Sequence, residues 1–372
     1  MIVPQRYNAR RVSVLEPSGQ ISPTPPEPVV TVVVVNWNRR ELLRSCLLSL
    51  EIQMGLAGIF EVILVDNGSE DQSVEMAERE FGDSASFRLR LIENDRNLGF
   101  CEANNQGMAL AQAPFIALLN NDAEAEPGWL AALHKGLIAH PGAGMAASKI
   151  LVWEDPGRID KAGHLIYLDG QNRGRGTGER DHGQYDKEAE ALWPDGCACL
   201  YRRSMIEEIG GFDEDFFAYA DDAELGLRAR IAGWGCIYVP TAVVRHHRGA
   251  TLGLANLRRL ELIERNRVLL VAKLFPWRLV WLNGVFYLAR LAAGALAAVR
   301  QRGEINRFPG SGGKLRVLLA LIRADLQALR MLPRMIAKRK KLDSIRKLSS
   351  HEITQLLWRN RITLKALSEQ SN

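Results

Sequence analysis

Apolar strand-like runs and amphipathic helix-like segments alternate along the first third of the chain. Continuous apolar runs rich in β-branched residues occur at 29–38, 60–69, 89–94 and 114–122. Such runs are typical of strands covered on both faces of a parallel sheet. The runs are separated by segments with apolar positions at helical spacing, at 40–53, 73–82 and 99–112. This alternation predicts βαβ units and a doubly wound α/β sheet.

Each of these predicted strands ends in polar residues, which we call the strand-end clusters. They are Asn36 and Asn38; Asp66, Asn67 and Ser69; Asn94 and Asn97; and Asn120, Asn121 and Asp122. One such cluster is often only turn chemistry, because Asn and Asp side chains bond their own backbone. Four clusters at one edge of a doubly wound sheet favour a polar ligand pocket, since ligands bind beyond the carboxyl ends of the strands.

The chain lacks the two common glycine-rich phosphate motifs. No GxGxxG follows the first predicted strand and no GxxxxGK[ST] occurs anywhere, which argues against a Rossmann cofactor site and a P-loop. A nucleotide would then need a carboxylate for its base or ribose and a metal for its phosphates. Asp122, at the rigid end of a strand, is suited to hold Mg²⁺ or Mn²⁺, which prefer oxygen ligands shared with substrate phosphates.

Two later stretches carry further candidate chemistry. Asp221 and Asp222 lie just ahead of an amphipathic helical pattern. They either cap the helix N-terminus or supply a general base, because each carboxylate raises the proton affinity of the other. His246 and His247 follow a later apolar strand. A lone histidine there would more often be structural, but the pair favours one metal ligand.

Charge is divided unevenly along the chain. With 47% hydrophobic and 24% charged residues, the composition excludes a wholly disordered protein. The overall charge of +5 combines 24 Lys and Arg against 36 Asp and Glu up to Leu257 with 24 against 7 from Arg258 onward. An acidic body with a basic C-terminal part predicts an anionic partner for that part, either phospholipid or nucleic acid.

Two segments of the basic part are predicted to be helical. Residues 278–299 are nearly long enough to span a bilayer. Because the central Arg290 is costly in hydrocarbon, we expect a helix that lies in the interface or packs on the preceding part of the chain. Residues 313–341 alternate apolar and basic positions at helical spacing, as membrane-surface helices do. A solvated helical face or a dimer contact is the alternative.

The N-terminal lead and the cysteines point to a cytosolic chain. Residues 1–28 lack the apolar core of a signal peptide and end in a Pro-rich stretch, so we expect a disordered lead. The five cysteines form neither a paired secretory framework nor two CxxC pairs. They are expected to be reduced thiols that mostly fill the core.

From Val32 to about Pro276 the chain resembles an inverting family 2 glycosyltransferase of the bacterial branch often labelled rhamnosyltransferase-like. The matching stretches are VVVVNWN, VILVDNGSED, ENDRNLGFCEANNQGM, ALLNNDAEAEPGWL, GCACLYRRSMIEEIGGFDEDFFAYADDAELGLRARIAGW, HHRGATLG and ERNRVLLVAKLFP. Their order and spacing are specific together, although each is weak alone. The resemblance implies a glycosyltransferase A-type α/β fold, a doubly wound mixed sheet, over residues 29–257, followed by a helical, basic, membrane-associating region at 258–372.

The resemblance also implies roles for individual residues. Those expected to contact the donor nucleotide are Asn36, Trp37, Asn38, Asp66, Asn67, Asn97, Gly99, Asn105 and Asn121, with Asp66 at the pyrimidine base. Those expected on the acceptor side are Trp193, Asp195 and Gly196.

The metal and base assignments follow from the same resemblance. Residues 120–122, NND, stand where the superfamily places its Asp-x-Asp motif, so Asp122 is expected to carry most of the metal binding. His246 is the matching histidine ligand, with His247 as the alternative. Asp222 matches the general base, and Asp221 replaces the family's Glu beside it, which leaves Asp221 as the other candidate.

The expected reaction is inverting transfer of a sugar from a dTDP- or UDP-linked donor, dTDP-rhamnose among them. The acceptor is expected to be a hydroxyl of a lipid-linked saccharide, the cofactor Mg²⁺ or Mn²⁺, and the pathway cell-surface polysaccharide synthesis. The enzyme is expected to be peripheral on the cytoplasmic face of the bacterial inner membrane, with the basic C-terminal region on anionic lipid.

Two other functions fit parts of the pattern. A sugar-phosphate nucleotidyltransferase would share the sheet and the metal carboxylates, but it would be expected to carry a Gly-rich basic loop where this chain has NWNRRE. A nucleic-acid-binding protein would explain the basic C-terminal part. The body is acidic, however, and no RRM, zinc-finger or convincing helix-turn-helix pattern accompanies that part.

Overall fold

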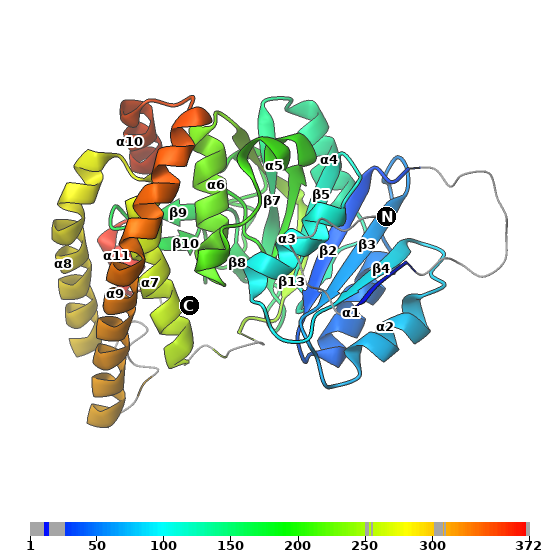
Figure 1. Cartoon of the computed structure of the whole chain (residues 1–372), viewed down its shortest axis with the longest axis horizontal. Coiled ribbons are helices and arrows are strands. Elements are labelled where there is room, and N and C mark those ends of the chain that lie inside the picture. Colours follow the sequence, from blue (N-terminus) through cyan, green and yellow to red (C-terminus); the bar gives the residue numbers. More distant parts are fainter. Residues whose placement is uncertain are drawn as a thin grey trace.

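The strands with polar ends lie side by side in one half of a mixed sheet that is covered by helices on both faces (Figure 1). The structure is a computed structural model, and it describes residues 11–14, 27–249, 253, 256–300, 308 and 310–369. The main sheet has the strand order β1-β4-β3-β2-β5-β12-β7-β13-β11, with β6 on β13 and β8 on β7. Strands β9 and β10 form a separate two-stranded sheet.

The strand bounds match the predicted runs. The strands are β1 Arg11–Val14, β2 Val30–Asn36, β3 Phe60–Asp66, β4 Arg88–Glu93, β5 Phe115–Leu119, β6 Ala123–Ala125, β7 Ala143–Val152, β8 Ile159–Lys161, β9 His164–Ile166, β10 Asn172–Gly174, β11 Ala189–Glu190, β12 Ala198–Arg202 and β13 Gly235–His246. The four predicted strands, β2 to β5, pair in parallel. β12 runs antiparallel to β5 and β7, which makes the sheet mixed as expected.

Several of the helices cover the two faces of this sheet. The helices are α1 Arg40–Glu51, α2 Ser73–Phe81, α3 Phe100–Leu110, α4 Trp129–Ala139, α5 Arg203–Ile209, α6 Asp221–Ile231, α7 Leu257–Leu274, α8 Trp277–Val299, α9 Gly310–Lys341, α10 Ser350–Arg359 and α11 Leu364–Glu369. Successive residues of a strand point to opposite faces. Val32 and Val34 therefore join the core under α1, α2 and α4, whereas Val33 joins the core under α3, α6 and α7.

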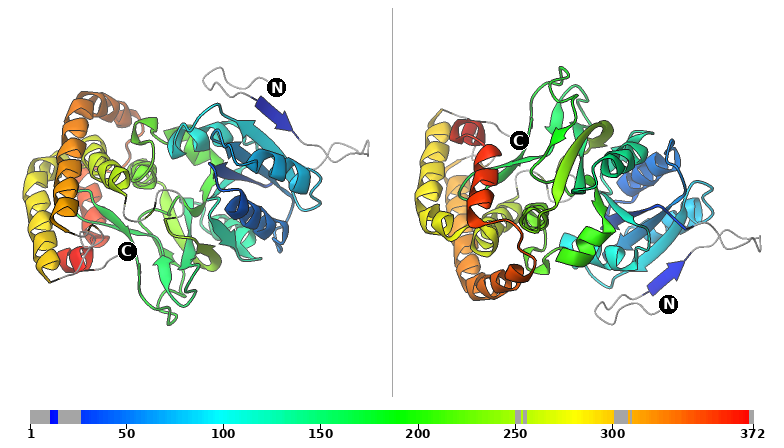
Figure 2. Two further views of the ribbon diagram at one scale, coloured as in Figure 1. Left: turned by 90° about the horizontal axis from the view of Figure 1, so that it is seen from below. Right: turned by 90° about the horizontal axis from the view of Figure 1, so that it is seen from above.

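The C-terminal helices lie at the end of the molecule opposite β1 and the first two helices (Figure 2). The predicted helices at 278–299 and 313–341 correspond to α8 and α9. α9 packs along α7 and contributes Ala324, Ala328 and Met335 to the buried interior. The basic region is therefore joined to the α/β part of the chain through a shared apolar interface.

Most of the lead expected to be disordered, residues 1–28, lies outside the described residues. Within it, residues 11–14 form strand β1, which pairs antiparallel with β4 at the edge of the sheet. That short strand was not expected from the sequence, because a four-residue edge strand carries too few positions to show a pattern. All five cysteines are free and buried, as expected.

Candidate active site

The ends of β2, β3 and β5 bring three of the strand-end clusters into one hydrogen-bonded group. Asn36 donates to Asp66 Oδ1 at 3.1 Å, and Asn121 donates to Asn36 Oδ1 at 2.7 Å. Asp66 also accepts from the backbone and the hydroxyl of Ser69, at 2.8 and 2.6 Å. Parallel register places Asn36 directly beside Asp66, so the polar edge predicted from the strand ends is present.

Asn38 and Asn67 extend this group to the neighbouring turns. Asn38 has a left-handed φ of 51°, its backbone N–H donates to Ser69 Oγ at 2.9 Å, and its Oδ1 accepts from Glu70 N at 2.7 Å. Asn67 Nδ2 donates to Gly99 O at 3.2 Å, with Asn97 Oδ1 at 3.4 Å. Trp37 is half-buried in the first of these turns.

Two of the expected nucleotide contacts face the loop before α6. The Asn105 carboxamide donates to Phe212 O at 2.9 Å and accepts from Phe212 N at 2.8 Å, and it also reaches Glu214 at 3.3 Å. Gly99 has φ of 88°, and a Cβ there would lie 2.5 Å from the Phe217 ring. Both residues therefore have a structural role in this loop, whatever else they contact.

Asp122 and His246 lie next to each other because β13 pairs with β6. The register sets His246 opposite Ala123, and His246 Nε2 is 3.5 Å from Asp122 Oδ1. That buried oxygen has no hydrogen-bond partner among the described residues. Its contact among the described residues is this 3.5 Å ion pair with His246, and a carboxylate facing an imidazole nitrogen suits a divalent metal.

A third residue, Asp160 of β8, orients this histidine. Its Oδ2 lies 2.8 Å from His246 Nδ1, and its Oδ1 lies 3.1 Å from Arg248 Nε. Burial raises the pKa of Asp160, but Lys161, His246 and Arg248 together bring it below its ordinary value, so this group is a carboxylate. Metal-binding histidines usually have a carboxylate on one ring nitrogen and the other nitrogen aimed at the ligand position.

His247 points to different groups. Its ring stacks on Trp153, with centroids 4.2 Å apart, and its nitrogens lie 3.8 Å from Glu124 and Glu154. Only its backbone N–H contacts Asp122, through the carbonyl oxygen at 2.9 Å. Of the two histidines, His246 is the one whose ring faces the Asp122 carboxylate.

A second polar group, the acid cluster, consists of Asp195, Asp222, His164 and Lys161. His164 Nε2 lies 2.8 Å from Asp195 and 3.3 Å from Asp222. Lys161 Nζ is 2.6 Å from Asp195. His164, Asp195 and Asp222 lie close enough together to be considered as metal ligands. A lysine ammonium already neutralises Asp195, however, which makes this position less suited to a further cation than the pair Asp122 and His246.

The two adjacent aspartates differ in exposure and in their neighbours. Burial raises the pKa of both carboxyl groups, and the charge of Asp195 adds to each rise. Asp221 is 6% exposed, and its pKa is raised well above its ordinary value. His164 and Lys161 oppose the rise at Asp222, whose side chain is 13% exposed. Asp222 is therefore the carboxyl that ionises more readily, and it is the less deeply buried of the two.

The expected acceptor-side residues lie around this cluster. Trp193 is fully buried, its ring lies 6.0 Å from that of His164, and its Nε1 has no partner among the described residues. A Cβ on Gly196 would lie 3.9 Å from Asp221 Oδ2. Asp195 belongs to the cluster itself, through His164.

Sequence patterns did not identify three residues of the site: Asp160, Lys161 and His164. They come from β8 and β9. Asp160 contacts His246, while the next residue, Lys161, contacts Asp195. This short strand thus links the pair Asp122 and His246 to the acid cluster. The stretch DKAGH matches no motif, and its only signal is a charged pair directly after an apolar residue in a short strand.

Comparison with known proteins shows similarity to one family. The family model described as Glycosyl transferase family 2 matches residues 31–210. The N-acetylglucosaminyl-diphospho-decaprenol L-rhamnosyltransferase of Mycobacterium tuberculosis H37Rv is 28% identical over 248 residues, covering 60% of this chain and 78% of that protein. The protein y4gI of Sinorhizobium fredii is 29% identical over 236 residues, covering 61% of this chain but only 25% of y4gI.

Solved structures show the same fold at low sequence identity. The mannosyltransferase PcManGT from Pyrobaculum calidifontis, in complex with GDP-Man and Mn²⁺, has a TM-score of 0.51 and 20% identity, over 82% of this chain and 88% of that one. GalNAc-T7 with UDP, GalNAc and Mn²⁺ has a TM-score of 0.55 and 15% identity, over 71% of this chain and 50% of that one. These similarities identify a glycosyltransferase A-type fold.

Proposed function

The chain is a member of glycosyl transferase family 2. We propose that it transfers the donor sugar by a single displacement that inverts the configuration at the anomeric carbon, with Asp222 as the general base. The observation that carries this proposal is the placement of the two polar groups on either side of β8. Asp160 orients the Asp122 and His246 pair, and Lys161 pairs with the acid cluster that includes Asp222. A diphosphate site and a base site are thereby held by adjacent residues.

In the proposed reaction, Asp222 removes the proton of an acceptor hydroxyl. The hydroxyl oxygen forms a bond to the anomeric carbon as the bond from that carbon to the nucleoside diphosphate breaks. His164, 3.3 Å from Asp222, holds the carboxylate in place and favours its ionised form. Asp221, beside it, is the more readily protonated of the two, because burial and the charge of Asp222 raise its pKa well above its ordinary value. One-step displacement by a base-activated hydroxyl inverts the configuration.

The residues that would hold a divalent metal are Asp122 and His246. The Asp122 oxygen that accepts no hydrogen bond, the imidazole nitrogen 3.5 Å from it and the orienting Asp160 would suit Mg²⁺ or Mn²⁺. When bound, such an ion stabilises negative charge on the departing diphosphate. The donor base is proposed to lie against Asp66 and the asparagines bonded around it.

The donor and acceptor are proposed from similarity. The M. tuberculosis relative is named for L-rhamnosyl transfer to N-acetylglucosaminyl-diphospho-decaprenol. We extend this to a dTDP- or UDP-linked sugar, dTDP-rhamnose among them, and to a lipid-linked saccharide. Such an acceptor is presented at the cytoplasmic leaflet, so the enzyme would have to work at that surface.

The exposed apolar face of α8 and α9 supports a membrane location. Residues Trp277–Ala297 are long and apolar enough to cross a membrane, and almost none of that stretch is buried. Arg290, in the middle of α8, nevertheless bonds Glu264 and Asp169 on the catalytic side. A helix bonded in this way at its centre would have to break buried ion pairs in order to span a bilayer. We propose that α8 lies flat on the membrane surface.

The opposite face of α8 carries Trp281, Val285 and Leu288, with exposed fractions of 83, 63 and 66%. These positions follow helical spacing and form one stripe. Six leucine and isoleucine side chains of α9 form a second stripe: Leu315, Leu318, Leu319, Ile322, Leu326 and Leu329. Exposed apolar stripes with basic side chains nearby are characteristic of helices on anionic membrane surfaces.

Replacement of Trp281, Val285 and Leu288 by Ser is expected to lower binding to vesicles of phosphatidylglycerol and phosphatidylethanolamine by at least about 100-fold. Each apolar side chain contributes about 1.5–3 kcal/mol when it leaves water, and three contributions are lost. Flotation of the purified protein with vesicles measures this. Truncation before α9 is unsuitable, because it would uncover the apolar side of α7.

The matched control replaces three exposed apolar residues outside α8 and α9. Ile52, Met54 and Ile138 are 55, 64 and 56% exposed, and their change to Ser should leave vesicle binding as in wild type. Unchanged flotation of the α8 variant would refute the surface-helix proposal.

The proposed reaction is tested first by nucleotide binding and nucleotide release. We expect UDP or dTDP to raise the melting temperature only when Mn²⁺ is present, because ligands that bind the native state stabilise it. We also expect release of the same nucleoside diphosphate from its sugar derivative. Formation of pyrophosphate from a sugar phosphate and a nucleoside triphosphate would instead support a nucleotidyltransferase.

A further inference from the structure

Three residues ahead of α6 hold backbone angles that residues with side chains rarely adopt. Phe217, Tyr219 and Ala220 have φ of 63°, 70° and 55°, and Ala220 directly precedes the aspartate pair. Left-handed angles at such residues persist only where the surroundings hold them. The direction in which Asp221 and Asp222 leave the loop therefore depends on whatever holds residues 216–220, which we call the base turn.

One side chain of α7, Asn266, bonds most of the base turn. Its Nδ2 lies 2.9 Å from Phe216 O, 2.9 Å from Ala218 O and 2.7 Å from Tyr219 O. The residue is fully buried. Because the amide has only two hydrogens, the three carbonyl oxygens share them. The amide thus gathers carbonyl groups from both sides of Phe217, and this convergence requires the turn to keep its unusual angles.

The neighbouring Arg265 fixes the orientation of that amide. Its Nε donates to Asn266 Oδ1 at 2.9 Å, so the amide oxygen faces the guanidinium and the nitrogen faces the base turn. Its Nη2 donates to Asp215 O at 3.1 Å and to Phe216 O at 2.9 Å. Arg265 and Asn266, from the stretch ERN, therefore act together, and we call them the α7 clamp.

Another carbonyl of the base turn is bonded to α3. Phe217 O accepts from the backbone N–H groups of Phe100 and Cys101, at 2.8 and 3.1 Å. These are free donors of a helix N-terminus, which need a partner when buried. The Phe217 side chain lies over Gly99, where a Cβ would clash with it. The turn is thus held between the first helical turn of α3 and the α7 clamp.

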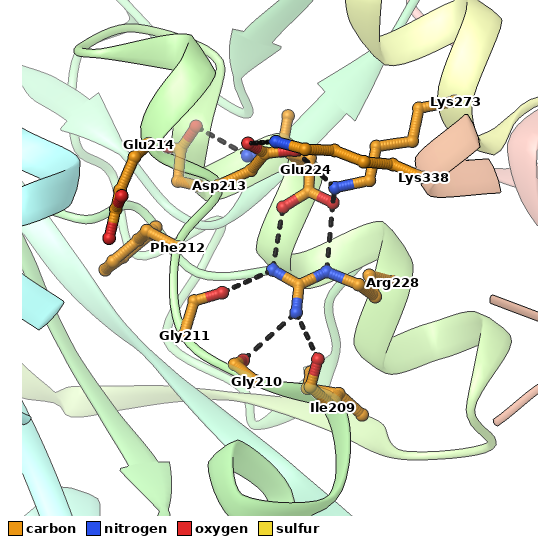
Figure 3. Close-up of polar contacts among 12 residues, drawn as sticks. Ile209, Gly210, Gly211, Phe212, Asp213, Glu214, Glu224, Arg228, Lys273 and Lys338 are labelled. Atoms are coloured by element: carbon orange, nitrogen blue, oxygen red, sulfur yellow. Dashed lines mark hydrogen bonds and ion pairs between the residues drawn. The ribbon is translucent and has the colours of Figure 1, made fainter. Parts of the chain in front are cut away.

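A second set of contacts holds the residues before the base turn (Figure 3). Arg228 of α6 donates to the carbonyl groups of residues 209–211. Lys273 of α7 lies 2.6 Å from Asp213, and Lys338 of α9 contacts the same carboxylate. These contacts fix the position of the chain just before the base turn. The clamp acts on the turn from which the carboxylates emerge.

We infer that the α7 clamp is a positioning device for catalysis: Asn266, oriented by Arg265, holds the base turn in the conformation that aims Asp222 at the acceptor hydroxyl. The inference rests on the role proposed above for Asp222. Neither clamp residue is proposed to touch substrate, and their effect passes through the backbone carbonyls of the turn to the base. Small displacements of a positioned group can cost about 10²-fold in rate.

The test compares Asn266→Ala with Leu270→Ala, a fully buried residue of the same helix that belongs to the apolar core. Hydrogen exchange of the amides of residues 216–222 should become at least about tenfold faster in Asn266→Ala and stay near wild type in Leu270→Ala. With the donor that the wild type uses, nucleotide release by Asn266→Ala should fall about 10²-fold in kcat. Its KM for that donor, and the melting shift with UDP or dTDP and Mn²⁺, should stay within about twofold of wild type.

A second variant keeps the test decisive if Asn266→Ala does not fold. Arg265→Lys retains the positive charge but loses the planar donor fork. Its kcat should also fall, by less than in Asn266→Ala, while its KM stays near wild type. A folded clamp variant with wild-type kcat would overturn the inference. A parallel loss of kcat, donor binding and melting temperature would also overturn it, as a general structural effect. A wild type that releases no nucleotide would contradict the proposed function, while hydrogen exchange would still decide whether the clamp holds the turn.

Discussion

Asp222→Asn is expected to lower the rate of sugar transfer by about 10²- to 10⁴-fold, the range that a positioned general base contributes. The amide keeps the shape of the carboxyl group and cannot accept the acceptor's proton. Nucleotide binding should remain near wild type, because Asp222 contacts His164 and belongs to the acid cluster, whereas the strand-end clusters lie around Asp66. Turnover and the melting shift with UDP or dTDP and Mn²⁺ are the two measurements.

Asp221→Asn is the matched comparison. Burial and the charge of Asp222 raise the pKa of Asp221 well above its ordinary value, so Asp221 is the more readily protonated of the two carboxyl groups and the one that a neutral amide resembles more closely. We expect this variant to retain at least about a tenth of wild-type turnover, since it removes no proton acceptor. If Asp221→Asn is inactive and Asp222→Asn is active, the base assignment is reversed. Loss of nucleotide binding in Asp222→Asn would indicate a structural role.

The dependence of wild-type turnover on pH also tests the assignment of Asp222 as the general base. Burial raises the pKa of Asp222 above that of an ordinary aspartate. The base must be ionised to accept a proton, so activity should be low below this raised pKa and should increase as the pH rises through it. His164 partly opposes the rise, and His164→Gln should therefore move the acidic limb to still higher pH.

The second large effect is expected at the Asp122 and His246 pair. Asp122→Asn and His246→Gln should each lower turnover by at least about 10²-fold. Each removes one proposed ligand of the divalent metal that would stabilise the departing diphosphate. Each should also remove the part of the UDP or dTDP melting shift that depends on Mn²⁺. Titration of Mn²⁺ in the melting assay separates weakened metal binding from a general loss of stability.

Two neighbouring substitutions make this result specific. His247→Gln should change neither turnover nor the Mn²⁺ dependence, because its ring stacks on Trp153 and faces Glu124 and Glu154. Asp160→Asn should weaken the response to Mn²⁺ by about 10- to 100-fold, as loss of a carboxylate that orients a metal ligand does. If His247→Gln abolishes the Mn²⁺ response while His246→Gln preserves it, the ligand assignment is wrong.

The sheet was predictable because its strands and helices have different periods. Continuous apolar runs distinguished β2 to β5, and helical spacing distinguished α1 to α3, so parallel βαβ order followed from the sequence pattern. The same alternation put the polar strand ends at one edge, and Asn36, Asp66 and Asn121 do meet there. The nucleotide, metal and base roles of individual residues came from resemblance and stay predictions.

Other parts of the site depend on contacts between segments far apart in the sequence. The choice between His246 and His247 follows from the register of β13 on β6, which no local pattern specifies. Asp160, Lys161 and His164 come from short strands whose few residues show no period. In the same way, the sequence placed a costly arginine at the centre of α8, but no local pattern indicates that its partners are Glu264 of α7 and Asp169.

By itself, then, the sequence determined the α/β architecture, the family resemblance, the acidic body with its basic helices, and the polar edge at which ligands are expected. Each of these properties is local or additive along the chain, and periodicity and composition report it directly. The tertiary structure alone decided which histidine faces Asp122, which aspartate is the more readily ionised, and how α7 clamps the base turn. Those features depend on burial and on strand register, which arise only when distant segments pack together.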